Sequence, residues 1–166
     1  MSTYAIQCCD DGGPLPRERA AECPADQAAT CGPRCLQEAL RRFGVRVSLS
    51  EAIARCKTTR AGTSVGNLLD AARTLGLRAE VCKAELGTLS GLLPSECVAV
   101  IAHIQSRHFV LVDGVCDERV ILWDPTEGDR DMTRAEFQCI WDGVLIVLAR
   151  ASGPRDARGP QHGAAR

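Results

Sequence analysis

The segment TCGPRCLQEAL, residues 30–40, places a cysteine at the point where a helix is predicted to begin. Pro33 is tolerated in a first helical turn, and Leu36 and Leu40 have the spacing of one helical face. The backbone N–H groups of a first turn have no intrahelical acceptors and the helix dipole is positive there, so both favour a thiolate over a thiol. Cys31 is therefore a candidate nucleophile.

The alternative for Cys31 is a buried thiol that only fills space, a common role in a chain with ten cysteines. Cys35 lies one turn further along the same predicted helix, where its surroundings are intrahelical neighbours rather than free N–H groups. We assign Cys35 to packing. The residues next to Cys31 leave both of its roles open, so the choice depends on finding a base.

A nucleophilic cysteine needs a base, most often a histidine, and a third group that orients the imidazole ring. The chain has three histidines, of which His162 lies in a C-terminal segment with no bulky apolar residue, and we expect no role for it. His103 ends the apolar run CVAVIAHI, and His108 begins the run HFVLVDGV. Both are candidates for the base, and either could be a simple turn residue.

Asp124 favours His108 over His103. In HFVLVDGVCDERVILWDP, His108 begins one predicted strand and Asp124 ends the next, so an antiparallel hairpin would place the two side by side. The alternative for Asp124 is a turn-forming aspartate in front of Pro125. A Cys–His–Asp set would support acyl transfer through a covalent intermediate.

The elements that must position these residues fall into two halves. Helical spacing, capping residues and terminating glycines predict helices over residues 31–43, from Ser48 or Ser50 to 56, and from Thr63 or Ser64 to 75. Short β-branched runs predict strands over 77–81, 97–104, 108–115, 119–124 and 143–149, with a helix over 133–141 that begins with a capping box. This order predicts an α+β fold in which a helical half packs on an antiparallel sheet.

Composition divides the chain into three parts. Residues 1–26 have glycines and prolines without a helical or strand period, which predicts a loop-like N-terminal segment. Residues 27–149 form the predicted folded domain, and residues 150–166 are expected to be a disordered tail.

Charge and motif content remove several classes of partner and cofactor. The formal net charge of −1 gives no support for nucleic acid or an anionic membrane as the main partner. No apolar run is long enough to span a membrane and the N-terminus lacks a secretory pattern, so we expect a cytoplasmic protein with reduced cysteines. There is no CxxC pair and no histidine with ligand spacing, so we expect neither a metal nor another cofactor.

Four segments together resemble the double-glycine leader peptidases, or bacteriocin-processing peptidases, which are papain-like cysteine peptidases often found at the N-terminus of ABC exporters. The segments are TCGPRCLQEALRRFGV, TTRAGTSVGNLLDAARTLGLRAEV, CVAVIAHI with HFVLVDGV, and RVILWDPTEGDRDMTRAEFQCIWDGVLIVL. The resemblance covers roughly residues 27–149. It implies a papain-like fold, a catalytic triad of Cys31, His108 and Asp124, and cleavage after a Gly-Gly pair that ends a leader peptide.

The sequence departs from this family at the oxyanion site. The family commonly has a glutamine six residues before the cysteine, and this chain has Ala25 there. Gln27, four residues before Cys31, is the candidate that a shifted loop would present. Because losing one oxyanion donor typically costs about 10²–10³ in rate, this substitution matters for the expected activity.

Three hypotheses follow from these residues. The first is a cysteine endopeptidase that cleaves Gly-Gly leaders, which the presence of Cys31, His108 and Asp124 favours. The second is a weak or inactive peptidase-like module that binds a leader or substrate segment for a separate transporter, which the displaced glutamine favours. The third is a papain-like hydrolase or transferase with another amide substrate. No membrane span and no GxxxxGK[ST] motif follows the domain, so we expect a free-standing domain that acts on leaders in trans or beside a separately encoded ABC exporter.

Overall fold

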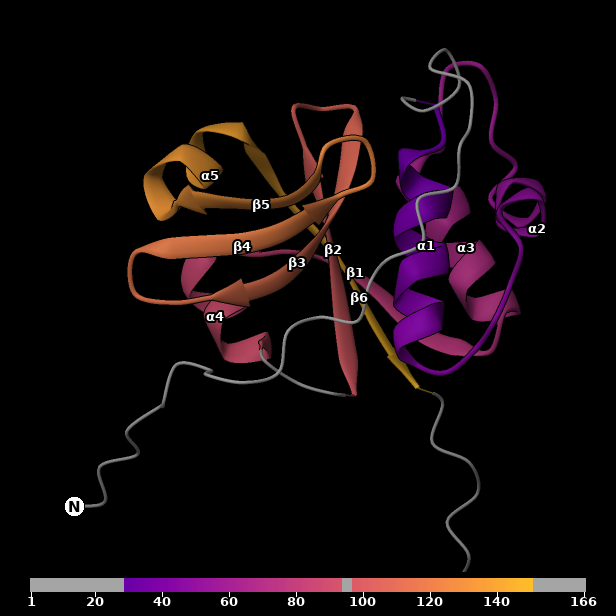
Figure 1. Cartoon of the computed structure of the whole chain (residues 1–166), viewed down its shortest axis with the longest axis horizontal. Helices are drawn as coiled ribbons and strands as arrows, with labels where there is room; N and C mark the ends of the chain where they lie inside the picture. Colours follow the sequence, from indigo (N-terminus) through magenta and orange to yellow (C-terminus); the bar gives the residue numbers. More distant parts are fainter. Residues whose placement is uncertain (1–28, 94–96, 151–166) are drawn as a thin grey trace, which may run out of the picture.

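The computed structural model describes residues 29–93 and 97–150, which form a six-stranded sheet with helices on both faces (Figure 1). The helices are α1 (Cys31–Arg42), α2 (Leu49–Arg55), α3 (Val65–Thr74), α4 (Leu86–Leu92) and α5 (Arg134–Ile140). The strands are β1 (Leu77–Lys83), β2 (Val98–Ile104), β3 (His108–Val115), β4 (Arg119–Asp124), β5 (Gly128–Thr133) and β6 (Trp141–Arg150). Residues 1–28 and 151–166, which hold most of the predicted N-terminal segment and tail, lie outside the described residues.

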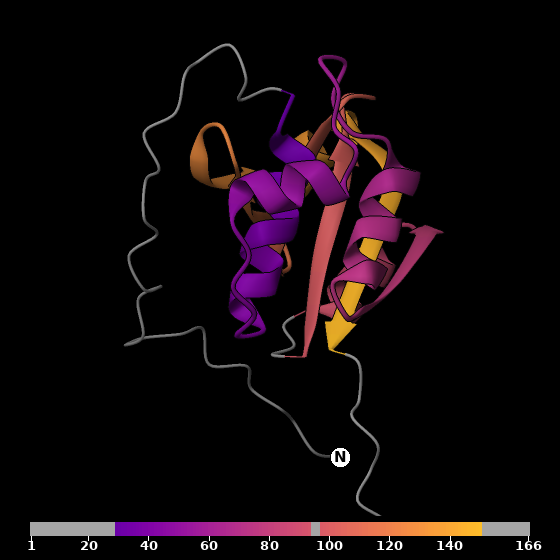
Figure 2. The same ribbon diagram turned by 90° about the vertical axis from the view of Figure 1, so that its right-hand side faces the viewer.

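The sheet is antiparallel throughout, with the strand order β1-β6-β2-β3-β4-β5. Helices α1 to α3 cover one face, and Figure 2 shows them in front of the strands. Helices α4 and α5 pack on the other face. The predicted α+β fold is therefore confirmed.

The capping residues determine where the first helices begin and end. The side chain of Ser48, not that of Ser50, accepts a hydrogen bond from the Glu51 N–H at the start of α2, at 3.1 Å. Ser64 caps α3 in the same way. Gly44 follows the C-cap residue of α1, and its φ of +76° is a left-handed conformation that glycine adopts without strain.

Two elements, α4 and β5, lack the sequence signals that predict the others. Helix α4, LGTLSGL, contains two glycines and only seven residues, so its propensity is weak and its packing through Leu86 and Leu89 holds it. Strand β5, GDRDMT, is rich in aspartate and glycine, which are depleted in strands. It forms because it continues from β4 through a tight turn and pairs along its whole length at the edge of the sheet.

The core has two layers because both faces of the sheet are covered. On β2 and β3, Ile101, Phe109 and Leu111 pack against the α1–α3 side, whereas Val100 and Val110 pack against the α4–α5 side. These central strands are therefore apolar at consecutive positions instead of alternating.

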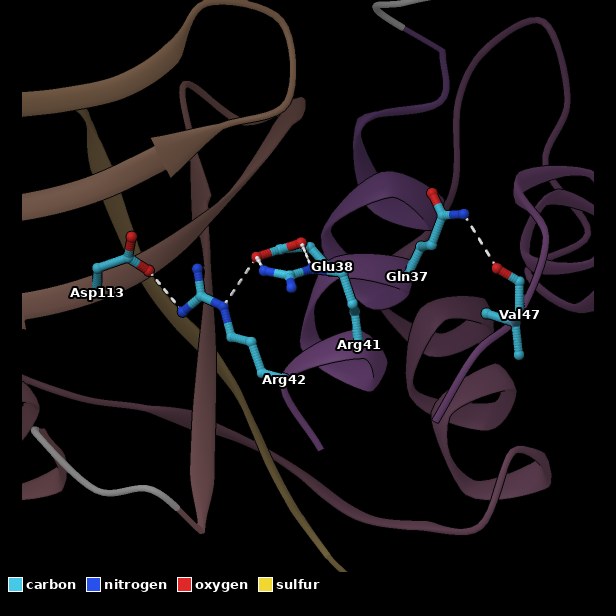
Figure 3. Close-up of polar contacts among 6 residues, drawn as sticks. All are labelled: Gln37, Glu38, Arg41, Arg42, Val47 and Asp113. Carbon is cyan, nitrogen blue, oxygen red and sulfur yellow. Dashed lines mark hydrogen bonds and ion pairs between the residues drawn. The ribbon is translucent and has the colours of Figure 1, made fainter. Parts of the chain in front are cut away.

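A partly buried charge network joins α1 to β3 at the end away from Cys31 (Figure 3). The Arg42 guanidinium lies between two carboxylates, at 3.1 Å from Glu38 on α1 and 2.7 Å from Asp113 on β3. Arg41 donates to the other side of the Glu38 carboxylate at 2.8 Å. The two elements are thus fixed to each other by a directional contact as well as by apolar packing.

No helix within residues 29–93 and 97–150 has the length and apolar character needed to cross a membrane.

We predict that Glu38→Gln destabilises the fold by about 1–3 kcal/mol at pH 7. Burial opposes ionisation of Glu38, but hydrogen bonds from Arg41 and Arg42 outweigh it and lower the pKa of the carboxyl group. Because the folded-state pKa lies below the unfolded one, this contribution is present above the ordinary glutamate pKa of about 4.3 and is lost as pH falls through the folded-state pKa. Urea denaturation at pH 7 and at pH 4 measures both effects.

The matched control is Glu51→Gln, which removes an exposed carboxylate whose contact with Arg55 is 3.6 Å long. Exposed pairs contribute little, so this variant should keep wild-type stability at both pH values. An acid-induced loss of stability that is as steep in Glu38→Gln as in the wild type would contradict the assignment.

Candidate active site

Cys31 is the first residue of α1, and its side chain is buried at 2% exposure. The side chain of the N-cap residue Thr30 makes no capping hydrogen bond to the helix and instead accepts one from the Arg34 side chain at 3.2 Å. The Thr30 hydroxyl therefore does not cap the N–H groups of the first turn, where Cys31 begins the helix.

Gly32 shows how closely the start of α1 packs. A Cβ atom at this position would lie 3.3 Å from the Phe109 ring on β3 and 3.3 Å from Thr63 Cβ in the segment before α3. Cys31 is therefore held against the beginning of β3, where His108 is the first residue.

The His108 ring has two partners. Its Nε2 atom lies 2.9 Å from Asp124 Oδ2, at the end of the neighbouring strand β4. Cys31 lies close enough to the ring to raise the pKa of His108, and since Nε2 is taken by the carboxylate, Nδ1 is the nitrogen left for sulfur. The β3–β4 register, in which Leu111 lies opposite Trp123, brings the histidine and the aspartate to the same end of the hairpin.

Asp124 uses both carboxylate oxygens, and it is 3% exposed. While Oδ2 contacts His108, Oδ1 accepts hydrogen bonds from the backbone N–H groups of Thr126 at 2.7 Å and Glu127 at 3.2 Å. Asp124 therefore acts both as a turn residue and as a partner of the imidazole. One oxygen accepts the hydrogen bonds of the turn after β4, and the other contacts the His108 ring.

The electrostatics of the site favour a protonated imidazole beside an ionised carboxylate. The hydrogen bond to Asp124, followed by the one to Cys31, raises the pKa of His108 to about 9 against the opposing effect of burial. Burial also opposes ionisation of Asp124, but the His108 and Thr126 hydrogen bonds outweigh it and lower the pKa of the carboxyl group. An imidazolium at neutral pH is the partner that stabilises a thiolate.

Cys35 has a different environment although it lies on the same helix. It is fully buried, and its Sγ donates to the Phe109 carbonyl oxygen at 3.3 Å. Burial, and then the negative charges of Cys31 and Asp124, raise the pKa of the Cys35 thiol well above its usual value. Cys35 therefore remains a neutral thiol that packs α1 on β3, as the sequence indicates.

The remaining candidates are placed as follows. His103 Nδ1 lies 2.9 Å from Asp142 Oδ2, so this histidine has a carboxylate partner other than Asp124. Gln27 and His162 lie outside the described residues. Within residues 29–93 and 97–150, no three His, Cys, Asp or Glu side chains are grouped so that they could hold a metal ion.

A cavity of about 440 Å³, which the sequence did not predict, opens beside the His108–Asp124 pair. Gln105, Thr126 and Met132 are among the residues that line it. It lies where the β2–β3 turn meets the turn after β4, so no single sequence segment could indicate it.

A cysteine at a helix start beside a His–Asp pair on an antiparallel sheet is the arrangement of papain-like cysteine peptidase folds. A family model described as the Peptidase C39 family matches residues 24–153. The chain therefore belongs to the Peptidase C39 family, in agreement with the resemblance of its four segments to double-glycine leader peptidases.

Solved structures of similar proteins share the fold. The double-glycine-motif protease of an AMS/PCAT transporter, in complex with the leader peptide, superposes with a TM-score of 0.69 at 25% identity, covering 83% of this chain and 91% of that one. The peptidase domain of Streptococcus ComA, a bifunctional ABC transporter of a quorum-sensing pathway, gives 0.67 at 27% identity over 74% of this chain and 93% of that domain.

Similar sequences occur both as short proteins and within transporters. An uncharacterized protein of Methanothermobacter thermautotrophicus is 29% identical over 121 residues, which is 73% of this chain and 82% of the relative. The pediocin PA-1 transport/processing ATP-binding protein PedD of Pediococcus acidilactici is 29% identical over 126 residues, 72% of this chain. The match spans only 17% of PedD.

We predict that Asp124→Asn lowers the pKa of His108 from about 9 toward the ordinary histidine value of about 6.5. The amide retains a hydrogen-bond acceptor but lacks the negative charge that favours the imidazolium. An NMR titration of the His108 ring protons measures the change. Asp131→Asn, which alters a carboxylate paired with Arg119, is the control and should leave the titration unchanged. An unaltered His108 pKa in Asp124→Asn would mean that the carboxylate charge does not act on the ring.

Proposed function

We propose that this protein is a cysteine endopeptidase that cleaves a leader peptide after a Gly-Gly pair, with Cys31 as nucleophile, His108 as base and Asp124 as the group that orients the ring. The observation that carries the proposal is the position of the His108 imidazole between the Cys31 side chain and the buried Asp124 carboxylate. The leader peptide bound to the similar transporter protease supports this class of substrate.

The reaction would start from a thiolate–imidazolium pair, in which the thiol proton of Cys31 resides on His108 Nδ1 because Nε2 is bound to Asp124. The thiolate attacks the carbonyl carbon of the second glycine and forms a tetrahedral intermediate. Its collapse breaks the C–N bond, and His108 gives its proton to the leaving amine. A water molecule, deprotonated by the same imidazole, then hydrolyses the thioester and releases the leader. Asp124 remains ionised throughout, in keeping with its lowered pKa.

The negative oxygen of the tetrahedral intermediate needs hydrogen-bond donors. The N–H groups at the start of α1 are oriented toward the Cys31 end of the helix, and we propose Gln27 as a side-chain donor beside them. This proposal goes beyond the resemblance to the leader peptidases. That family has its glutamine at the position of Ala25, whereas Gln27 lies two residues nearer to the cysteine.

A binding module without useful activity is the second candidate function, and the alanine at position 25 favours it. Such a module would hold the leader for a transporter and leave cleavage to another protein. Cleavage of a bound leader by the wild-type protein is the outcome that separates the first candidate from the second.

The partner that supplies the substrate is also a proposal. PedD and several other relatives carry the matching region as 17–18% of a transport or secretion ATP-binding protein. We propose that the domain described here receives leaders in the cytoplasm, either in trans or beside a separately encoded ABC exporter.

The central test is incubation with a peptide whose leader ends in Gly-Gly, followed by mass analysis of the products. Wild type should yield a fragment that ends at the second glycine, and Cys31→Ala should yield none because the nucleophile is absent. Cys82→Ala, which alters an exposed thiol on β1, is the matched control and should cleave at the wild-type rate. Binding of the peptide by wild type without cleavage would instead support the module, and cleavage by Cys31→Ala would exclude this mechanism.

We predict that Gln27→Ala lowers kcat by about 10²–10³ with little change in KM, because an oxyanion donor acts mainly in the transition state. Steady-state kinetics on the same leader peptide measure both constants. Gln37→Ala is the comparison, since the Gln37 side chain donates to the Val47 carbonyl oxygen away from Cys31. An unchanged kcat in Gln27→Ala would remove this residue from the oxyanion site.

A further inference from the structure

The turn that leads into His108 has an unusual backbone. Gln105 and Ser106 both have positive φ angles, +52° and +56°, and the Arg107 N–H donates to the Ile104 carbonyl oxygen at 3.2 Å. Two successive left-handed residues are the requirement of a type I′ turn, which normally uses Asn-Gly. A chain with glutamine and serine at these positions needs outside contacts to hold the conformation.

Contacts from the junction of α5 and β6 hold this turn. The Gln105 N–H donates to the Ile140 carbonyl oxygen at 2.7 Å. The Ser106 N–H donates to Asp142 Oδ2 at 2.7 Å, and the Ser106 hydroxyl lies 3.4 Å from Oδ1 of the same carboxylate. Asp142 therefore contacts the turn through both oxygens.

A β-bulge directs Asp142 toward the turn. His103 pairs with Val144 while the next residue, Ile104, pairs with Trp141, so Asp142 and Gly143 are extra residues on β6. Gly143 has a φ of +75°, which a residue with a side chain would adopt only with strain. Bulges of this kind re-aim a side chain next to functional sites.

The same carboxylate is connected to the candidate site by a second route. The His103 Nδ1 atom lies 2.9 Å from Asp142 Oδ2, and the His103 ring packs on the Phe109 ring with centroids 4.9 Å apart. Phe109 is the residue that follows His108 and contacts the start of α1. Asp142 thus supports both the turn before His108 and the residue after it.

We infer that Asp142 is a positioning residue for His108, and that it acts by holding Gln105 and Ser106 in the left-handed conformation that sets the start of β3. The turn pairs Ile104 with His108, so a relaxed turn would displace the imidazole from both Cys31 and Asp124. The inference takes His108 as the base of the proposed function, but its test needs no leader peptide.

The test is the second-order rate of alkylation of Cys31 by iodoacetamide between pH 5 and pH 9, with each cysteine resolved by peptide mass. In Asp142→Ala we expect a rate at pH 6 at least about tenfold below wild type and a profile shifted toward that of an ordinary thiol. Asp142→Asn retains an oxygen acceptor for the Ser106 N–H, so its alkylation rate should lie between those of Asp142→Ala and wild type. Asp70→Ala, an exposed carboxylate on α3, should match wild type.

Rescue distinguishes positioning from a general loss of stability. In the Asp142→Ala background, Gln105→Asn with Ser106→Gly supplies a sequence that adopts the turn on its own, so most of the alkylation rate at pH 6 should return. A wild-type profile in Asp142→Ala would overturn the inference. So would a folded Asp142→Ala protein whose reactivity the new turn does not restore, since Asp142 would then act through its charge on His103.

A second readout separates this inference from the proposed function. The His108 pKa, followed by NMR, should fall in Asp142→Ala and recover in the rescued variant, because the imidazole returns to Asp124. A protein that shows this series but does not cleave Gly-Gly peptides would support the inference and contradict only the proposed function. Unchanged His108 titration in Asp142→Ala would overturn the inference, whether or not peptides are cleaved.

Discussion

Helix α1 packs lengthwise along β3, and the distances in the candidate site follow from that contact. The two elements run in the same direction, so Cys31 and His108 meet at one end and Arg42 and Asp113 at the other. At 1.5 Å per helical residue, Cys31 and Arg42 lie about 16 Å apart along α1. At 3.3 Å per strand residue, His108 and Asp113 lie about 16 Å apart along β3. Matching lengths allow polar contacts at both ends, with apolar packing and the Cys35 hydrogen bond between them.

The same contact explains why two cysteines on one helix have different surroundings. Cys31 is the first residue of α1 and lies beside the His108 ring. Cys35 lies one turn further in, where burial removes water and nearby anions disfavour ionisation. A shift of one helical turn thus moves a cysteine from beside the imidazole into the packed interior, and the separation depends on α1 staying in register with β3.

The sequence predicted those parts of the fold that local signals encode. Caps at Ser64 and Thr133 located helices, and the spacing from His108 to Asp124 predicted their meeting, because a hairpin is a local structure. Helix α4 and strand β5 were missed because tertiary packing and edge pairing hold segments whose own propensities are poor.

The contacts of Asp142 could not be predicted for a related reason. The Asp-Gly pair at residues 142–143 is a local turn signal, but its meaning depends on a bulge between β6 and β2, strands separated by more than thirty residues. The predicted helix ended at residue 141 and the predicted strand began at residue 143, so the residue between them had no assigned place.

The strand order has a consequence for biosynthesis. Strand β6 lies between β1 and β2, so the last strand of the domain to be translated joins the helical half to the β2–β5 meander. Until residues 141–150 emerge from the ribosome, the sheet has a gap between β1 and β2, and the turn before His108 lacks its contacts with the α5–β6 junction. A domain assembled in this order would acquire the full set of contacts around the beginning of β3 only when its synthesis is complete.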